Sequence, residues 1–176
     1  FSLLFFFVNF WRNDRLNRLS DDALNLSRSV LSIYEVNNIT EIREDNLNLI
    51  EASFSSMADY ADADIFIVSS DGRVMMCREK AENGFCFVHG GVVFPREILV
   101  QAENVYPVTF SEETDLDFAD ESVFLSALSL HISEESVCYI IAMQDVSSAY
   151  VPYTTEFLRM FILASLFDVI VDVIVD

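Results

Sequence analysis

The stretch ADIFIVSSDGRVMMC, residues 63–77, decides the fold that this sequence predicts. Residues 65–68 form a short apolar run of β-branched and aromatic side chains, which is typical of a buried strand. The four letters SSDG follow, and Gly72 can take the positive φ that a tight hairpin turn requires. The apolar run resumes at residues 74–76. The stretch therefore predicts a strand, a turn and a second strand.

Apolar segments lie near both ends of the chain, at residues 1–11 and 157–167. The first is too short to span a bilayer, which takes about 20 apolar residues. We expect residues 1–11 to be the outer end of a first transmembrane helix, with Trp11 at the membrane interface. Residues 153–176 would begin a second one. That tail is atypical, because an Asp at the membrane centre costs about 2.5–3.5 kcal/mol. It carries Asp168, Asp172 and Asp176 at four-residue spacing.

Between these ends the apolar pattern predicts helices first and strands later. Residues 13–34 should form an amphipathic helix, because apolar side chains recur every three or four positions. The arginines at positions 12, 15, 18 and 28 lie largely on its other faces. A second helix covers residues 40–58, capped by Thr40. The other predicted elements are a helix at 95–102, a strand at 105–110, an acidic loop at 111–122, strands at 123–133 and 136–145 joined by Glu134 and Glu135, and a final helix from Pro152.

This order of elements predicts an α+β fold. Long N-terminal helices pack on a five-stranded antiparallel sheet, and a helix follows at the C-terminus. The strands at 123–133 and 136–145 are apolar on both faces over long stretches, so we expect them to be central in the sheet.

Composition and charge exclude several classes of partner. The chain has 176 residues, enough for one compact domain with helical ends, and 52% of them are hydrophobic. Its formal net charge is -19 at pH 7, which argues against nucleic acid, since nucleic-acid binding needs a basic surface. The same charge argues against docking of the folded domain on anionic lipid head groups. It fits an extracytoplasmic soluble domain and equally a cation binder.

Enzymatic motifs are missing from the sequence. There is no nucleophile elbow and no phosphate-binding glycine loop. The acidic residues between 115 and 121 lack the central glycine and terminal glutamate of a calcium-binding EF-hand loop, so we expect a solvated loop. We predict neither catalysis by this chain nor a cofactor.

Four segments in order carry a resemblance to a known family. They are DIFIVxSDGRVxxC at 64–77, CxxHGGxVxPxxIL at 86–99, the strand pair at 123–145, and FLRMFILASL at 157–166. Placed after a long amphipathic helix, they resemble the extracytoplasmic sensor domains of bacterial two-component histidine kinases, of the PAS-like single Cache type. The resemblance covers most of the chain and implies a PAS-like sheet.

The resemblance also implies a function and a domain organisation. Residues 1–11 would end a first transmembrane helix, 12–152 would be the sensor domain outside the cytoplasm, and 153–176 would start a second transmembrane helix. The domain would sense a small-molecule or redox signal at the cell membrane. It would act as a homodimer and pass the signal through its helices to a cytoplasmic histidine kinase. No kinase part is present in these 176 residues.

Three cysteines are present, Cys77, Cys86 and Cys138. Cys77 and Cys86 flank a polar loop, and in an oxidising compartment a disulfide between them would contribute roughly 2–3 kcal/mol. Free thiols are the first alternative. A zinc site with His89 and either Glu79 or Glu82 is the second, because thiolate and imidazole are zinc ligands. Cys138 sits in an apolar strand and is expected to be a buried, inert thiol.

The ligand-binding residues follow from the resemblance, since PAS-like folds hold ligands on the sheet face and in the loop at 78–93. The polar candidates there are Arg78, His89, Tyr106 and Tyr139. Arg78 would suit a carboxylate ligand through bidentate pairing. His131 is expected to be a structural residue near a sheet edge. If His89 and His131 shared a cavity, they would make the sensor respond to pH near 6–7.

Two functions from other classes stay open at this point. One is a small metal-dependent hydrolase that uses the acidic loop. The other is a structural or adhesive module tethered to a membrane.

Overall fold

The computed structural model describes residues 2–42, 46–51, 63–79, 84–86, 91–133 and 136–150, together with Arg159 and Ile162. Its first element is α1, Ser2–Val36, a helix of 35 residues. α1 ends where Asn38 takes a φ of 54°, a left-handed conformation that asparagine tolerates better than most residues. The backbone N–H of Ile39 then bonds to the carbonyl of Tyr34 at 2.9 Å. The predicted helix at 13–34 and its break are confirmed.

The second predicted helix starts later than the sequence suggested. Glu41 and Ile42 are not helical, and helical residues are described only at 47–51. Asn46 rather than Thr40 precedes the helix, and its carbonyl accepts the N–H of Leu49 at 3.1 Å. Asparagine is favoured just before a helix, because its side chain can form local hydrogen bonds with backbone groups that would otherwise take part in helical bonding. The start at residue 40 is therefore wrong, and residues 43–45 and 52–58 of that prediction lie outside the described residues.

The predicted hairpin is present as β1, Asp64–Ser69, and β2, Val74–Glu79. The strands pair antiparallel, and Phe66 lies opposite Cys77. Gly72 in the turn has a φ of 88°, as its position predicted. A three-residue strand, β3, Gly84–Cys86, continues the sheet beside β2. The hairpin is thus confirmed as the start of the sheet.

The middle of the chain differs from its prediction in one strand. Pro95 precedes α3, Arg96–Asn104, close to the expected 95–102. The next strand is β4, Phe110–Thr114, so the predicted strand at 105–110 and the loop at 111–122 are wrong in their boundaries. Four of the five residues of β4, SEET, are polar. An edge strand accepts them because one of its sides has no strand partner.

The last two strands are β5, Val123–His131, and β6, Val137–Asp145. The sheet order is β3-β2-β1-β6-β5-β4, which puts β1, β6 and β5 in its centre. Residues 123–130 and 138–144 are all buried, as expected for central strands. Five strands of five or more residues form the antiparallel, PAS-like sheet that the sequence predicted, with β3 added at one edge.

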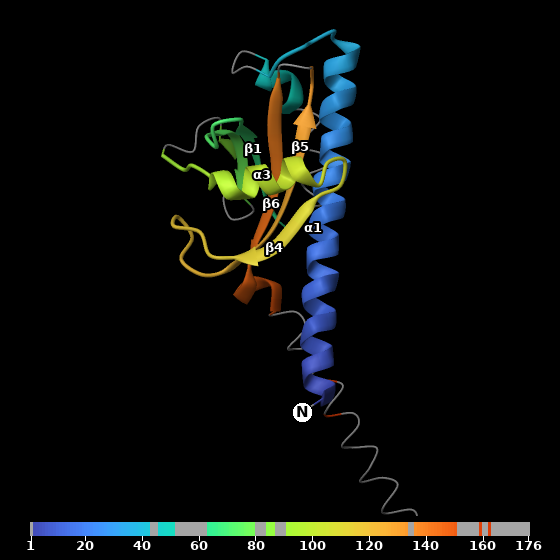
Figure 1. Ribbon diagram of the computed structural model, residues 1–176, viewed down its shortest axis with the longest axis vertical. Coiled ribbons are helices and arrows are strands. Elements are labelled where there is room, and N and C mark those ends of the chain that lie inside the picture. Colours follow the sequence, from blue (N-terminus) through green and yellow to red (C-terminus); the bar gives the residue numbers. More distant parts are fainter. Residues whose placement is uncertain are drawn as a thin grey trace, which may run out of the picture. The chain divides into compact units, whose positions relative to one another are not determined.

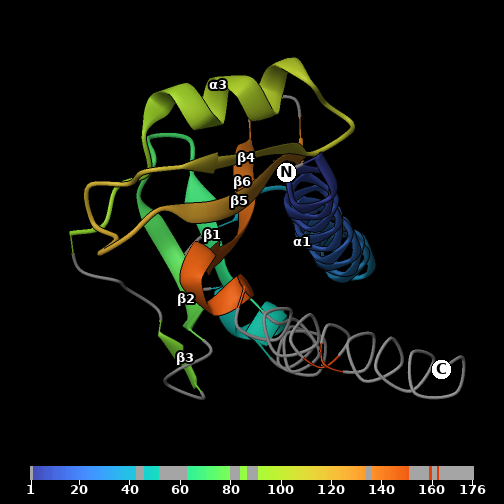
Figure 2. The same cartoon turned by 90° about the horizontal axis from the view of Figure 1, so that it is seen from below.

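Different helices cover the two faces of the sheet. α3 packs against β5 and β4, and its Ile98, Leu99 and Ala102 are buried with Val123 and Leu125. α1 packs against β5 and β4 from the other face (Figure 1). Seen from below, the sheet separates the two helices (Figure 2). We call these the α3 face and the α1 face.

Residues 145–176 form a separate compact unit. Residues 146–150 are helical, and the Ser148 hydroxyl bonds to the carbonyl of Asp145 at 2.9 Å. The predicted start of the final helix at Pro152 lies outside the described residues. Arg159 and Ile162 are helical and exposed. Among the described residues, no helix is both long and apolar enough to cross a bilayer.

Candidate functional site

The α3 face of the sheet is packed with apolar side chains. Phe94 lies at its centre, and its ring contacts Phe66 at 5.3 Å and Phe118 at 5.1 Å between centroids, both edge-on. Phe66 and Phe94 are 3% and 2% exposed. Edge-to-face aromatic packing of this kind holds the rings in place. The described part of this face is therefore a hydrophobic core rather than a polar ligand site.

Tyr139 brings a polar group to the edge of this core. Its side chain is on β6 and is 2% exposed, and its hydroxyl donates a hydrogen bond to Glu103 Oε1 at the end of α3. Burial, together with this bond to a carboxylate, raises the pKa of Tyr139. Tyr139 therefore joins β6 to α3 as a neutral hydrogen-bond donor.

Arg78 lies on the other face of the sheet from Tyr139. In the ladder, Arg78 is opposite Ile65, and Ile65 is opposite Ala142. Residues directly opposite each other share a face, and side chains alternate along a strand. Ala142 and Tyr139 are three residues apart on β6, so they point to opposite faces. The register does not bring these two predicted ligand residues together.

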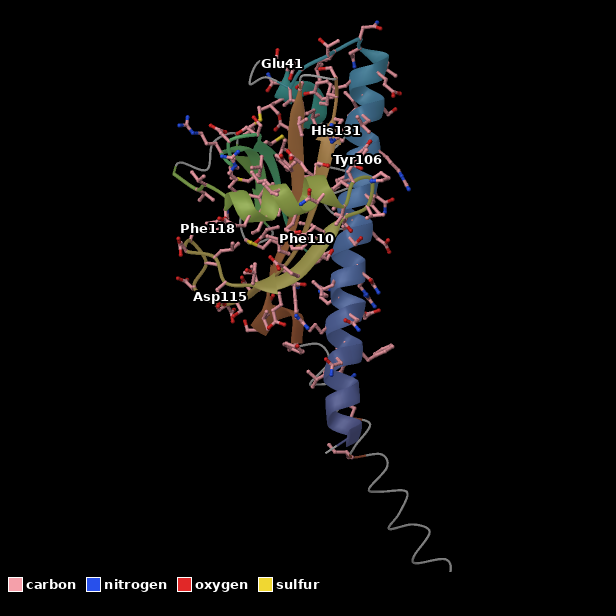
Figure 3. The ribbon with its side chains drawn as sticks, viewed as in Figure 1. Glu41, Tyr106, Phe110, Asp115, Phe118 and His131 are labelled. Carbon is pink, nitrogen blue, oxygen red and sulfur yellow. The ribbon has the colours of Figure 1, made fainter. Side chains whose placement is uncertain are left out.

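Tyr106 and His131 form an exposed pair near the end of β5. Their rings meet edge-on with centroids 4.6 Å apart (Figure 3). Tyr106 is 52% exposed, so it lies outside the core that holds Tyr139. His89 lies outside the described residues, so a cavity shared with His131 stays a prediction.

The cysteines fall into two environments. Cys138 is free and 4% exposed, and burial raises its pKa to about 12. Cys77 is disulfide-bonded. Cys86 lies directly opposite Cys77 in the β2–β3 ladder, but its side chain is outside the described part. The Cys77–Cys86 pairing therefore stays a prediction, now with a backbone register that suits it.

An open groove of about 420 Å³ lies at the end of the sheet where β1 finishes and β6 begins. Ser69 of β1 is opposite Cys138 of β6 there. Its polar lining is Glu41, Ser69, Ser70, Glu103 and Ser136. Its apolar lining is Ile42, Met75, Val137 and Cys138. Sequence reasoning missed this groove, because its walls come from five separate segments.

Polar contacts fasten α1 to the sheet. The Nε of Arg15 donates to Gln144 Oε1 of β6, and both residues are nearly buried, at 7% and 8% exposed. The Arg12 Nε lies 2.9 Å from a carboxylate oxygen of Glu113 on β4. The hydroxyls of Ser20 and Thr109 are hydrogen-bonded to each other, ahead of β4.

The burial of Arg15 corrects the prediction that the helix arginines lie on other faces. Arg15 precedes Leu19 by four residues, so it falls on the buried stripe that Leu19 and Ala23 continue. This four-residue spacing is the feature of the sequence from which the burial of Arg15 could have been predicted. Arg15 also acts on its own helix: burial raises the pKa of Asp22, and the positive charge of Arg15 opposes the rise.

The acidic side chains do not form a metal site in the part of the chain that the structure describes. No group of three or more His, Cys, Asp or Glu side chains there could hold an ion. Asp115 and Phe118 lie on the connection between β4 and β5, away from Glu41 (Figure 3).

Comparisons with known proteins return structural neighbours only. No protein-family model matches the chain, and no curated protein does. One similar structure is the ligand-binding domain of Campylobacter jejuni chemoreceptor Tlp3 in complex with 4-methylisoleucine, with 10% identity, a TM-score of 0.48, and coverage of 79% of this chain and 62% of that one. Another is the sensory domain of the same chemoreceptor, with 10% identity, a TM-score of 0.46, and coverage of 80% and 64%. The chain spans less than two thirds of both structures.

Proposed function

We propose that this chain is the extracytoplasmic signal-sensing domain of a membrane receptor and has no catalytic activity of its own. The observation that carries the proposal is the attachment of the long α1 helix to central strand β6 through the buried Arg15–Gln144 hydrogen bond. A helix that is joined in this way to the centre of a sheet moves with it. The 35-residue α1 can therefore transmit a change in the sheet along its length.

The mechanism is a shift between two packings of α1 on the sheet. A signal that binds one packing better than the other changes their populations by that difference in affinity. Interfaces made of interlocked side chains favour discrete arrangements, and polar contacts such as Arg12–Glu113 and Ser20–Thr109 define one of them. The receptor would be a homodimer anchored through residues 1–11 and 153–176, with a histidine kinase as its cytoplasmic part.

A chimeric receptor tests the proposal. The chain replaces the sensor domain of a membrane histidine kinase whose output drives a reporter gene. Arg15→Met should change the basal reporter output several-fold, because it removes the contact between α1 and β6. Arg28→Met is the matched control, since Arg28 is exposed on the same helix, and should leave output unchanged. Equal outputs from both variants, with both proteins folded and inserted, would contradict the proposal.

A redox signal is a finer form of the same proposal. Cys77 of β2 lies opposite Cys86 of β3, so a disulfide between them would link the edge strand β3 to β2. Peptide mapping without reduction should find the Cys77–Cys86 cross-link, and Cys86→Ser should abolish any response of the reporter to dithiothreitol. A cross-link that includes Cys138 would contradict this pairing.

The ligand residues predicted from the resemblance are also proposals. Arg78 and Tyr139 belong to different faces, so they would serve different ligands or different steps. Tyr106 would act with His131 at the surface, and His89, which lies outside the described residues, would act separately. Single substitutions Arg78→Gln and Tyr106→Phe in the chimera separate these roles, because each leaves the core intact.

A further inference from the structure

The groove at the end of the sheet has the dimensions and lining of a small-ligand site. Its volume of about 420 Å³ is within the range of roughly 300–1,000 Å³ that ligand pockets occupy. Five segments contribute to it, so it depends on the folded sheet: the residues after α1, the end of β1, β2, the end of α3, and the start of β6. None of its described lining residues belongs to the segment 78–93, where the resemblance placed a ligand.

Charge fixes the class of ligand. The two charged side chains of the described lining, Glu41 and Glu103, are both carboxylates and come from different segments. The hydroxyls of Ser69, Ser70 and Ser136 can accept hydrogen bonds beside them. A protonated amine has N–H donors and no acceptor, so it matches this lining, whereas an anion would be repelled. The net charge of -19 adds a long-range attraction for cations.

The apolar side chains favour an organic cation over a metal ion. Ile42, Met75 and Val137 line the groove together with the carboxylates, and they suit a hydrocarbon portion. Calcium takes 6–8 oxygen ligands at 2.3–2.6 Å, and no cluster of three or more potential metal ligands occurs among the described residues. We propose that this groove binds a small organic ammonium ion that carries an apolar group.

The two acidic residues of the groove are connected to different parts of the sensor, Glu103 through its carboxylate and Glu41 through its backbone carbonyl. Glu103 accepts the hydroxyl hydrogen bond of Tyr139, a buried residue of β6. The backbone carbonyl of Glu41 accepts the Asn46 side-chain N–H at 2.8 Å. The Oδ1 of Asn46 in turn accepts the hydroxyl of Tyr34 of α1 at 2.9 Å, and Tyr34 is 1% exposed. A cation that draws Glu41 and Glu103 together therefore acts on α1 and β6 at once.

The test is an NMR titration of the whole 176-residue chain with n-butylammonium, with 1-butanol as the neutral analogue. We expect millimolar affinity for n-butylammonium, at least tenfold weaker binding of 1-butanol, and amide shifts concentrated at residues 69–75 and 136–138. Glu41→Gln and Glu103→Gln should each weaken binding about fivefold. Glu97→Gln is the matched control, because Glu97 is exposed on the same helix as Glu103, and it should change nothing.

Three results would overturn the inference. One is equal binding of the alcohol. Another is a Glu97→Gln variant that weakens n-butylammonium binding as much as the groove variants do, which would show that overall negative charge rather than the groove attracts the ligand. The third is displacement of n-butylammonium by equimolar Mg²⁺, which would identify an inorganic-ion site. Circular dichroism melting of each variant verifies that it is folded.

The biological meaning of the groove rests on the proposed sensing function, and the two fail separately. Binding in the titration without any response of the chimeric receptor would leave the groove assigned and contradict sensing through it. If Arg15→Met changes the output of the chimeric receptor but n-butylammonium does not bind, the sensing function would be supported and the ligand assigned to the groove would be contradicted.

Discussion

Gly72 is a residue whose backbone conformation the hairpin requires. Its φ of 88° is unfavourable for residues with a Cβ, and a Cβ built there would lie 2.6 Å from the backbone oxygen of Phe94. Phe94 also donates its N–H to the carbonyl of Gly72 at 2.8 Å, so neither backbone can retreat without breaking that bond. The turn thereby positions the ring at the centre of the α3 face.

Gly72→Ala should lower the free energy of unfolding by about 2–4 kcal/mol, through the positive φ and the backbone clash together. Gly91→Ala is the matched control, because Gly91 has a φ of 92° with nothing within 4 Å of a built Cβ. It should cost only about 1 kcal/mol. Urea unfolding of both variants measures the difference. Equal costs would mean that the contact with Phe94 relaxes freely.

Cys138 makes stability depend on pH in the alkaline range. Burial raises its pKa from 9.0 to about 12, so the folded state keeps a proton that the unfolded state loses. This contribution is fully present below pH 9 and is lost between pH 9 and 12 as the pH rises. The slope is about 1.4 kcal/mol per pH unit.

Between pH 8 and 10.5, Cys138 should therefore account for roughly 2 kcal/mol of lost unfolding free energy. Cys138→Ala should remove that part of the slope and leave the contribution of Tyr139, whose pKa is also raised by burial. Urea unfolding at four pH values compares the two proteins. Parallel curves for the variant and the parent protein would show that Cys138 does not cause the dependence.

At the scale of elements, the α1 helix and the sheet are joined by a polar contact inside an apolar interface. Leu19, Ala23 and Leu26 of α1 are at most 2% exposed, and Arg15 extends the same stripe. Removing one partner of a buried hydrogen bond leaves the other unsatisfied, which costs more than replacing both with apolar groups. Arg15 and Gln144 should therefore behave as a coupled pair.

Arg15→Met should destabilise the protein by about 1–3 kcal/mol, because the Gln144 amide oxygen loses its buried donor. Adding Gln144→Leu should recover part of that loss, giving a coupling energy of about 1 kcal/mol in a double-mutant cycle. Arg18→Met is the control, since the Arg18 side chain is 61% exposed in its pair with Asp14 and should cost under about 0.5 kcal/mol. Additive effects of the two interface changes would contradict the coupling.

Elements with strong local signals were predictable from the sequence. The hairpin at 63–77 combines a β-branched run with turn chemistry, and β5 and β6 are apolar on both faces. β4 was missed because Glu112 and Glu113 resemble a solvated loop in sequence. Only the tertiary fold shows that Glu113 has Arg12 beside it and that Ser111 bonds to Ser126 at 2.9 Å.

At the scale of the whole molecule, the candidate sites depend on register and on contacts between distant segments. Arg78 and Tyr139 could not be assigned to faces until Ile65 was known to lie opposite Arg78. The groove was equally hidden, because Glu41 lies after the end of α1, Glu103 lies near the end of α3, and the fold brings both to the groove beside the end of β1 and the start of β6. Contacts between distant segments leave no local pattern in the sequence. The fold class was therefore predictable from the sequence, and the ligand site was not.

The net charge of the molecule gives a prediction of its own. With 29 acidic and 10 basic residues, the chain carries -19, and a charge so far from zero destabilises the compact state through self-repulsion. Added salt screens this repulsion, since the Debye length falls from about 30 Å at 0.01 M to about 10 Å at 0.1 M. Stability should therefore increase with NaCl at neutral pH.

The form of that increase identifies its cause. Screening should raise the melting temperature by several degrees between about 0.01 and 0.3 M NaCl and then level off, because the Debye length by then is shorter than most separations between surface charges. Exclusion of salt from the protein surface would instead continue to raise it towards 1 M. Calorimetric melting across this range separates the two. A melting temperature that falls, or that rises linearly throughout, would show that attractive ion pairs such as Arg12–Glu113 or surface exclusion outweigh the repulsion.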